Sequence, residues 1–212
     1  MHDKFFQIAR LNMVKNQILP NNVKNKVLIE SFSKIQKEFF VPKDKYDLTY
    51  TDSEINITKN RNLMKTFVLA KMFERCNFNI DDKVLVIGCL TGYSIAILAN
   101  LVNYVVGIDN EKKIIEMACK NIDKLDILNS SIFYKKDLSQ GLNRNAPYDK
   151  IFIEGAVSKI PDSLVKQLRE NGEIYAVMKN DEYIGEFVRG LKINSTLSFE
   201  KFLDRKSTRL NS

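Results

Sequence analysis

The feature that most constrains the fold of this chain is a stretch of 25 residues without a charged side chain, residues 84–108. A uniformly apolar stretch of this length would be long enough to cross a bilayer. Polar residues and glycines interrupt it instead: Gly88, Thr91, Gly92, Ser94, Asn100 and Asn103. We interpret residues 84–87 and 104–108 as buried strands and residues 94–101 as the helix between them, which is typical of a parallel βαβ unit. We therefore expect no membrane association.

Strands and helices continue to alternate after this unit. We expect an amphipathic helix over residues 111–125 and another that begins near Pro161 and ends at Gly172, a residue type that often caps helices. Further strands are expected at residues 132–134, 151–153 and 174–178. This order predicts an α/β fold with a doubly wound, mostly parallel, Rossmann-like sheet over residues 76–205.

Residues 1–75 differ from this region because their apolar residues recur mostly at helical spacing. They predict an N-terminal helical extension. Its helices are expected at residues 13–18, 23–35 and 62–76, with Pro42 marking the end of the second and a polar, irregular segment over 44–59.

The end of the chain shows a different pattern. Residues 183–202 read as strand material, whereas residues 206–212 are polar and show no periodicity. We expect those last residues to be a non-native tail, extended and packed on nothing, and a final strand of the sheet to be missing. An open sheet edge would favour aggregation or pairing with another chain.

The composition excludes several classes of function. The net charge is +7, but the basic residues are scattered, so we expect no nucleic-acid partner. The three cysteines form no C-x-x-C pair and the only histidine is His2, which argues against any metal site and against a histidine-dependent triad. The absence of a signal peptide and of a disulfide framework favours a cytoplasmic location.

A glycine-containing turn follows the first strand of the βαβ unit. It reads Gly88-Cys89-Leu90-Thr91-Gly92-Tyr93, and glycines there let a ligand approach the backbone closely. Asp109 ends the next strand, 21 residues after Gly88, where an acidic side chain can accept hydrogen bonds from two ribose hydroxyls. We expect an adenosine-containing ligand here. The alternative is an ordinary βαβ turn with an incidental aspartate.

The sequence of residues 84–99, VLVIGCLTGYSIAILA, resembles motif I of the S-adenosylmethionine (SAM) methyltransferases. Its Gly-Tyr pair is typical of the protein-L-isoaspartate O-methyltransferases. Other pieces of that family's pattern follow in order over residues 13–180: Met13-Val14-x-x-Gln17-Ile18, Glu38-Phe39-Phe40-Val41-Pro42, Asp137-Leu138 before Gly141, Ala146-Pro147-Tyr148-Asp149-Lys150-Ile151, and Pro161 with Leu164, Gln167, Leu168 and Gly172.

This resemblance implies SAM as cofactor and carboxyl methylation of isoaspartyl residues in damaged proteins, with a protein or peptide carboxylate as partner. The sequence leaves the oligomeric state open, and a monomer is expected. The resemblance places the substrate loop within residues 1–75, with Arg61 and Met64 as substrate-side residues. Glu154 is a third substrate-side candidate because it follows a strand at the carboxyl end of the sheet, where ligands bind; the alternative is a solvated loop charge. The cofactor-binding residues would be Gly88, Cys89, Thr91, Gly92, Tyr93, Asp109, Asn110, Asp137 and Leu138. Asp137 would accept a hydrogen bond from the adenine amino group, or else it caps a helix.

The chain departs from the family pattern in its substrate loop. The family carries T-I-S-x-P-Y where this chain has Asn62-Leu63-Met64-Lys65-Thr66-Phe67, so Met64 replaces the serine taken as catalytic and Thr66 replaces the proline. Val86 and Leu90 replace an acidic residue and a glycine of motif I. The stretch Arg61–Met64 resembles the R-x-L-M of a divergent bacterial branch. No catalytic residue is assigned from this loop.

Loss of the serine need not abolish methyl transfer. A carboxylate acceptor is already ionised near neutral pH, with a reference pKa of about 4, so no general base is required and the serine would only orient it. We therefore expect SAM binding with weak or absent isoaspartyl methylation. Met64 could equally be a packing residue at the start of a helix.

Three other functions are alternatives to isoaspartyl methylation. A SAM-binding protein without catalysis, or with a changed acceptor, is the main alternative. A nucleic-acid methyltransferase would carry an N-P-P-Y or D-P-P-Y tetrad where this chain has Glu154-Gly155-Ala156-Val157. A nicotinamide dehydrogenase would carry G-x-G-x-x-G in the turn.

Overall fold

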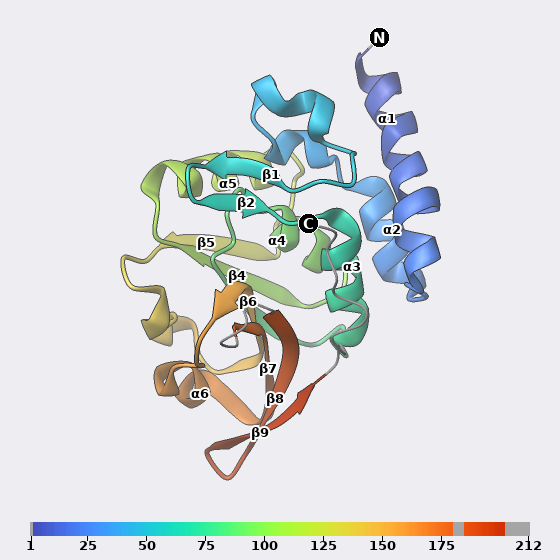
Figure 1. The fold of residues 1–212 in the computed structure, drawn as a ribbon. Coiled ribbons are helices and arrows are strands. Elements are labelled where there is room, and N and C mark those ends of the chain that lie inside the picture. Colours follow the sequence, from blue (N-terminus) through green and yellow to red (C-terminus); the bar gives the residue numbers. More distant parts are fainter. Residues whose placement is uncertain (1, 180–184, 202–212) are drawn as a thin grey trace.

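The computed structural model describes residues 2–179 and 185–201. Its centre is a seven-stranded sheet with the strand order β5-β4-β3-β6-β7-β8-β9 (Figure 1). The five strands β3 to β7 are parallel to one another, and β8 and β9 are antiparallel additions at one side. The predicted α/β class and mostly parallel sheet are confirmed.

The βαβ unit read from the uncharged stretch consists of β3 (Lys83–Ile87), α4 (Tyr93–Leu98) and β4 (Tyr104–Asp109). The remaining elements follow in chain order: α5 (Lys112–Asp123), β5 (Ser130–Tyr134), β6 (Tyr148–Val157), α6 (Asp162–Gln167), β7 (Leu168–Lys179), β8 (Gly185–Ile193) and β9 (Thr196–Lys201).

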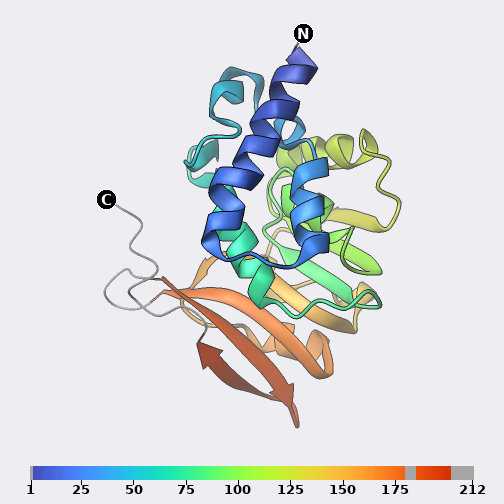
Figure 2. The same ribbon diagram turned by 90° about the vertical axis from the view of Figure 1, so that its right-hand side faces the viewer.

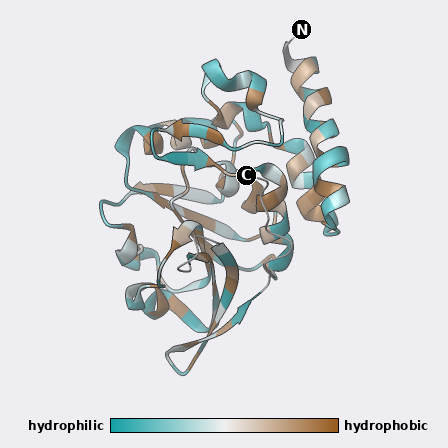
Figure 3. Cartoon of the chain, in the orientation of Figure 1, coloured by the Kyte–Doolittle hydropathy of each residue, from teal (hydrophilic) through white to brown (hydrophobic). Residues whose placement is uncertain are grey.

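Both faces of the central strands are covered by apolar side chains. Along β3, Val84 and Val86 join the cluster beneath the N-terminal helices, whereas Leu85 and Ile87 join the cluster beneath α6. Burying a side chain of this size contributes about 1.5–3 kcal/mol. This two-sided burial explains why the strands lack the polar alternation of a half-exposed sheet, and the apolar colouring runs along them in Figure 3.

The N-terminal extension consists of α1 (His2–Met13), α2 (Lys26–Lys34), the hairpin of β1 (Ile55–Thr58) and β2 (Arg61–Leu63), and α3 (Thr66–Arg75). Single turns of tighter or wider helix occupy Val14–Ile18, Leu19–Asn21, Lys37–Phe40 and Lys43–Leu48. In Figure 2 α1 and α2 lie side by side, above the strands at the chain's C-terminal end.

Several predicted boundaries in this extension were wrong. The first helix begins at His2 rather than at residue 13. The second ends at Lys34, before a separate turn that leads to Pro42. Residues 44–59 include β1, and residues 62–63 form β2 rather than a helix, because Leu63 pairs with Ile55 and both side chains are fully buried.

The expected helix end at Gly172 was also wrong. Helix α6 ends at Gln167, and Leu168 already pairs with Tyr148 in the sheet. The backbone turns extended at Leu168 because this residue joins the sheet, and the buried Gln167 side chain before it bonds the Gln140 carbonyl and the Leu142 N–H, both at 2.8 Å.

The strand material expected at residues 183–202 is present as β8 and β9 within the described part of the chain. There, β9 pairs with β8 and with no second strand. The expected non-native tail, residues 206–212, lies outside the described residues, so its extended state and the missing last strand stay predictions. No helix in the described ranges is long and apolar enough to span a membrane.

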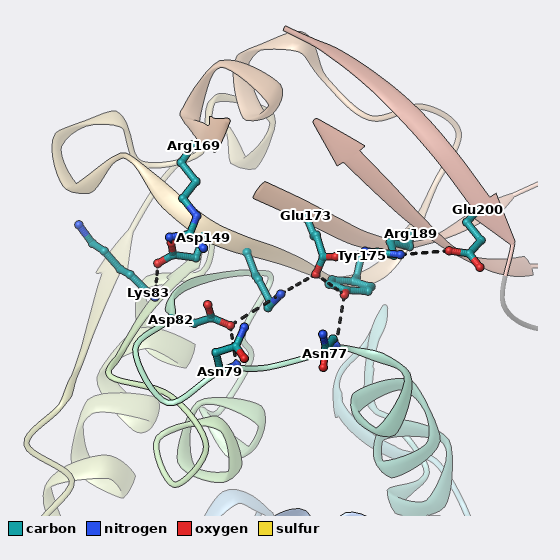
Figure 4. A network of polar contacts seen from close by, with 11 residues as sticks. Asn77, Asn79, Asp82, Lys83, Asp149, Arg169, Glu173, Tyr175, Arg189 and Glu200 are labelled. Atoms are coloured by element: carbon teal, nitrogen blue, oxygen red, sulfur yellow. Dashed lines mark hydrogen bonds and ion pairs between the residues drawn. The ribbon is translucent and has the colours of Figure 1, made fainter. Parts of the chain in front are cut away.

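A polar network holds the amino ends of the strands together (Figure 4). At its centre Glu173 of β7 accepts hydrogen bonds from Lys150 of β6 at 2.5 Å, from the Tyr175 hydroxyl at 2.7 Å and from Arg189 Nε of β8 at 2.7 Å. Asp82, just before β3, lies 3.7 Å from the Lys150 ammonium. The network thus joins β6, β7 and β8 at the edge of the sheet opposite the carboxyl ends of the parallel strands.

Candidate functional site

The turn after β3 has the backbone that its glycines predict. Gly88 and Gly92 have φ values of 78° and 93°, in the left-handed region that favours glycine. A Cβ on Gly88 would lie 3.2 Å from Arg61 Nη2 and 3.2 Å from the Glu154 carbonyl oxygen. Gly88 therefore leaves room at the point where β3, β6 and the β1–β2 hairpin meet.

Asp109 lies directly beside this turn, with a fully buried side chain. Its Oδ2 accepts the Leu90 backbone N–H at 3.0 Å, and its Oδ1 accepts those of Asn110 at 2.8 Å and Glu111 at 3.3 Å. These three backbone donors fix the carboxylate in place. The predicted juxtaposition of the turn and Asp109 is therefore present.

A fourth donor to Asp109 comes from the N-terminal extension. Arg61 of β2 donates from Nη1 to Asp109 Oδ1 at 2.6 Å and from Nη2 to the Gly88 carbonyl at 3.0 Å. Oδ1, with two lone-pair sites, thus accepts from three donors, whereas Oδ2 accepts only the Leu90 N–H and has one site left. Arg61 was predicted from the sequence to be a substrate-side residue, but its ion pair with Asp109 was not predicted.

Glu154 of β6 lies on the other side of Gly88. Ser94 of α4 donates to its Oε2 at 2.5 Å, while Oε1 is buried with no hydrogen-bond partner among the described residues. Burial raises the pKa of Glu154 to about 7, although the Ser94 hydrogen bond and the Arg61 charge act in the opposite direction. A buried polar atom without a partner is costly and marks a place where a ligand could donate.

A cavity of about 640 Å³ opens at these residues, which is within the usual size range of small-molecule sites. It lies at the carboxyl ends of the parallel strands, where ligands bind in open α/β sheets. Its lining comprises Arg61, Ile87, Gly88, Asn110, Leu138, Ser139, Ile153, Glu154, Gly155, Ala156, Val157, Ser158, Lys159, Pro161, Leu164 and Lys179. Ser139, Lys159 and Lys179 had not been predicted, because nothing in their local sequence distinguishes them from surface residues.

Other residues proposed from the sequence lie behind this surface. Thr91 donates through its hydroxyl to the Phe40 carbonyl at 2.7 Å, and the Tyr93 ring packs on Phe40, 5.4 Å between centroids. Cys89 is buried, and burial raises the pKa of its thiol, so it is no nucleophile. Gly92 faces Ala118 of α5. These four residues shape the turn from within and do not line the cavity.

Asp137 and Met64 also lie outside the cavity lining. The exposed Asp137 carboxylate accepts from the Ser139 backbone N–H at 3.0 Å and from its hydroxyl at 2.6 Å, which caps the short helical turn Leu138–Gln140. Met64 is partly buried against the core cluster beneath the N-terminal helices. A helix cap for Asp137 and a packing role for Met64 are the structural alternatives considered from the sequence, and their roles toward ligands stay predictions.

The family can be decided from comparison with known proteins. A family model described as Protein-L-isoaspartate(D-aspartate) O-methyltransferase matches residues 9–198. The protein-L-isoaspartate O-methyltransferase of Geobacter metallireducens is 31% identical over 82% of this chain and 81% of its own length. The chain belongs to this family. That of Protochlamydia amoebophila is also 31% identical, over 76% of this chain and 77% of its own.

Solved structures support the same fold. One described as a protein-L-isoaspartate O-methyltransferase covers 96% of this chain with a TM-score of 0.77 at 22% identity, and the match spans 63% of that longer chain. A Plasmodium falciparum protein assigned to the family, solved with S-adenosyl-L-homocysteine, covers 92% of this chain and 94% of its own with a TM-score of 0.77 at 17% identity. The chain is thus a SAM-dependent methyltransferase of the isoaspartate-repair type.

Proposed function

We propose that this chain binds SAM in the cavity at the carboxyl ends of β3, β4 and β6 and methylates the carboxylate of an isoaspartyl residue in a protein or peptide. The observation that carries the proposal is the buried Asp109 carboxylate beside the Gly88 turn. It is the acceptor that two ribose hydroxyls require. Residues 76–205 would supply the cofactor site, and residues 1–75 would add Arg61 to it.

The residues around the cavity fit the proposed cofactor. Gly88 leaves space next to the backbone, and Asn110 and Leu138 extend the lining on the side of β4 and β5. The unpartnered Oε1 of Glu154 offers an acceptor or a negative charge to an amino or sulfonium group. A cavity of about 640 Å³ is large enough for a ligand of this size.

SAM would supply a methyl group already activated on a positively charged sulfur. The acceptor carboxylate is ionised at neutral pH, so no side chain of this protein has to remove a proton from it. The protein's own contribution is to hold the acceptor in line with the methyl group and to keep water out. Such alignment can contribute up to about 7–11 kcal/mol.

Within this proposal, Met64 at the family's serine position predicts a reduced rate of isoaspartyl methylation. No hydroxyl stands where the family serine would orient the acceptor, and Met64 packs against the core instead. The same observation supports the second candidate function, a SAM-binding protein with little turnover or a changed acceptor.

Calorimetry with SAM, followed by transfer of labelled methyl to an isoaspartyl peptide, tests the proposal. The matched control is the same peptide with an ordinary aspartyl residue, which should accept nothing. Asp109→Ala should weaken SAM binding about 10- to 150-fold, because it removes hydrogen bonds to a charged acceptor. Unchanged SAM affinity in that variant would remove Asp109 from the site. SAM binding without transfer to either peptide would favour the second candidate.

A further inference from the structure

The ion pair between Arg61 and Asp109 is in conflict with the site proposed above. Because three donors share Asp109 Oδ1, which has two lone-pair sites, a ribose hydroxyl can bind this oxygen only if one of the four present donors leaves. Three of these donors are backbone N–H groups of the turn and of the chain after β4. Arg61 is the fourth, and it is the only one on a side chain that can rotate away.

The surroundings of Arg61 allow such a movement. Its side chain is 22% exposed, whereas that of Asp109 is fully buried. Its second contact is a single hydrogen bond from Nη2 to the Gly88 carbonyl. Arg61 also lines the cavity itself, so a guanidinium displaced from Asp109 remains at the same opening.

A displaced Arg61 would be a cation without its anionic partner next to a cavity. Unpaired charges in partly buried positions favour the arrival of a counter-ion. The acceptor is a carboxylate, and a guanidinium binds carboxylates through two parallel hydrogen bonds, which an ammonium such as that of Lys159 or Lys179 cannot form.

We propose that Arg61 exchanges one binding partner for another. It binds Asp109 while the cofactor is absent, and once the cofactor ribose has replaced it there, it binds the acceptor carboxylate. This inference rests on the proposed function. It makes Arg61 a specificity-determining residue and predicts that the cofactor binds before the acceptor. Methylation turns the carboxylate into a neutral ester, which weakens the hold of Arg61 on the product.

The first test uses S-adenosyl-L-homocysteine, which binds without turnover, and compares wild type with Arg61→Met by calorimetry. Methionine keeps much of the aliphatic stem and removes the competing donors. We expect binding to be about 5- to 50-fold tighter in the variant, because no ion pair has to be broken. Arg75→Met, which removes an exposed arginine of α3, is the matched control and should leave the affinity unchanged. Equal or weaker binding in Arg61→Met overturns the exchange.

A double-mutant comparison adds a readout that a purely structural role would not move. Asp109→Ala should cost more S-adenosyl-L-homocysteine affinity in the Arg61→Met background than in wild type, because in wild type the ribose gains Asp109 Oδ1 only by displacing Arg61. Equal costs in the two backgrounds contradict the proposal. Unfolding midpoints of all variants, measured in urea, separate this effect from loss of stability.

The second test measures binding of a fluorescent isoaspartyl peptide with and without S-adenosyl-L-homocysteine. In wild type the cofactor product should tighten peptide binding about 5- to 30-fold, and in Arg61→Met this coupling should vanish. Arg61→Lys should retain only part of it, since the ammonium lacks the planar fork. Coupling that persists in Arg61→Met overturns the acceptor role.

These two tests distinguish the inference from the proposed function. The titration with S-adenosyl-L-homocysteine needs no acceptor, so it decides the exchange at Asp109 even if isoaspartyl peptide is not the substrate. Conversely, a peptide that wild type methylates but that Arg61→Met binds equally well leaves the proposed function standing and refutes the role of Arg61.

Discussion

At the scale of single residues, Glu154 is the polar group of the candidate site whose hydrogen-bonding capacity is least satisfied. One of its oxygens has no partner in the described structure, and burial raises the pKa of its carboxyl to about 7. Its neighbours act in opposite directions, since Ser94 and Arg61 favour the charged form and Asp109 disfavours it. Such a perturbed acid at the edge of a cavity is typical of functional sites.

This pKa predicts a dependence of stability on pH. In the unfolded chain Glu154 titrates at its ordinary pKa of 4.5, so between pH 4.5 and about 7 the folded state holds a proton that the unfolded state releases. Stability should therefore fall as pH rises through this window, by up to about 3 kcal/mol from this group. Urea unfolding at about pH 5 and about pH 8 measures the difference.

Glu154→Gln should remove that part of the pH dependence. Glu116→Gln, at an exposed position of α5, is the control and should retain it. If wild type and Glu154→Gln lose stability equally between the two pH values, the carboxyl is not protonated in the folded protein.

At the scale of elements, the junction between β2 and α3 decides what the substrate loop can do. Met64 follows the last residue of β2 and packs against the core, while Thr66 begins α3. The Thr66 hydroxyl accepts a hydrogen bond at 2.8 Å from the buried ammonium of Lys37. Burial lowers the pKa of Lys37 to about 7, so the loss of this contact would add to an existing cost.

The junction predicts different results for two substitutions that restore the family pattern. Met64→Ser should raise isoaspartyl methylation if the serine only orients the acceptor. Adding Thr66→Pro should lower stability by about 1–3 kcal/mol, because it leaves the Lys37 ammonium without its acceptor, even though proline suits the first turn of a helix. Labelled methyl transfer and urea unfolding measure the two effects.

A wild-type rate typical of efficient enzymes, with kcat/KM above about 10⁴ per molar per second, would contradict the premise that Met64 limits turnover. A double variant as stable as Met64→Ser would show that Lys37 finds another partner.

At the scale of the whole molecule, polar contacts fall at both ends of the parallel strands, and they differ in kind. At the carboxyl ends, Glu154 lines a cavity, and the buried Asp109 is paired with Arg61, which lines the same cavity. At the amino ends, Glu173 and Lys150 are both buried and satisfied by each other (Figure 4). Burial alone would raise the pKa of Glu173, but the hydrogen bonds from Lys150, Tyr175 and Arg189 hold it below its ordinary value.

Because the two sets of polar contacts lie at opposite ends of the parallel strands, a substitution at the amino ends should change stability without changing ligand affinity. Glu173→Ala should destabilise the fold by about 3–5 kcal/mol, because it leaves Lys150 buried without its main partner. Affinity for S-adenosyl-L-homocysteine should not change while the protein is folded. Glu200→Ala, at the exposed end of the same network, should cost at most about 1 kcal/mol. A large loss of affinity in folded Glu173→Ala would show that the two ends are coupled.

The sequence alone determined the βαβ unit, the glycine turn and the position of Asp109. Strands that are buried on both faces are continuous apolar runs, so residues 84–87 and 104–108 could be recognised without knowledge of their neighbours. The carboxyl ends of adjacent parallel strands meet at one edge, and the turn and Asp109 therefore had to lie together once the strands were placed.

Only the tertiary structure decided which side chain meets Asp109 and where Met64 packs. Arg61 is 48 residues away from Asp109 along the chain, and its position depends on a hairpin whose register is set by the burial of Ile55 and Leu63. The physical reason is that strand and helix patterns report the burial of a segment's own side chains. An ion pair between distant segments leaves no such periodicity, and Arg61 alone has the sequence signature of an ordinary surface charge.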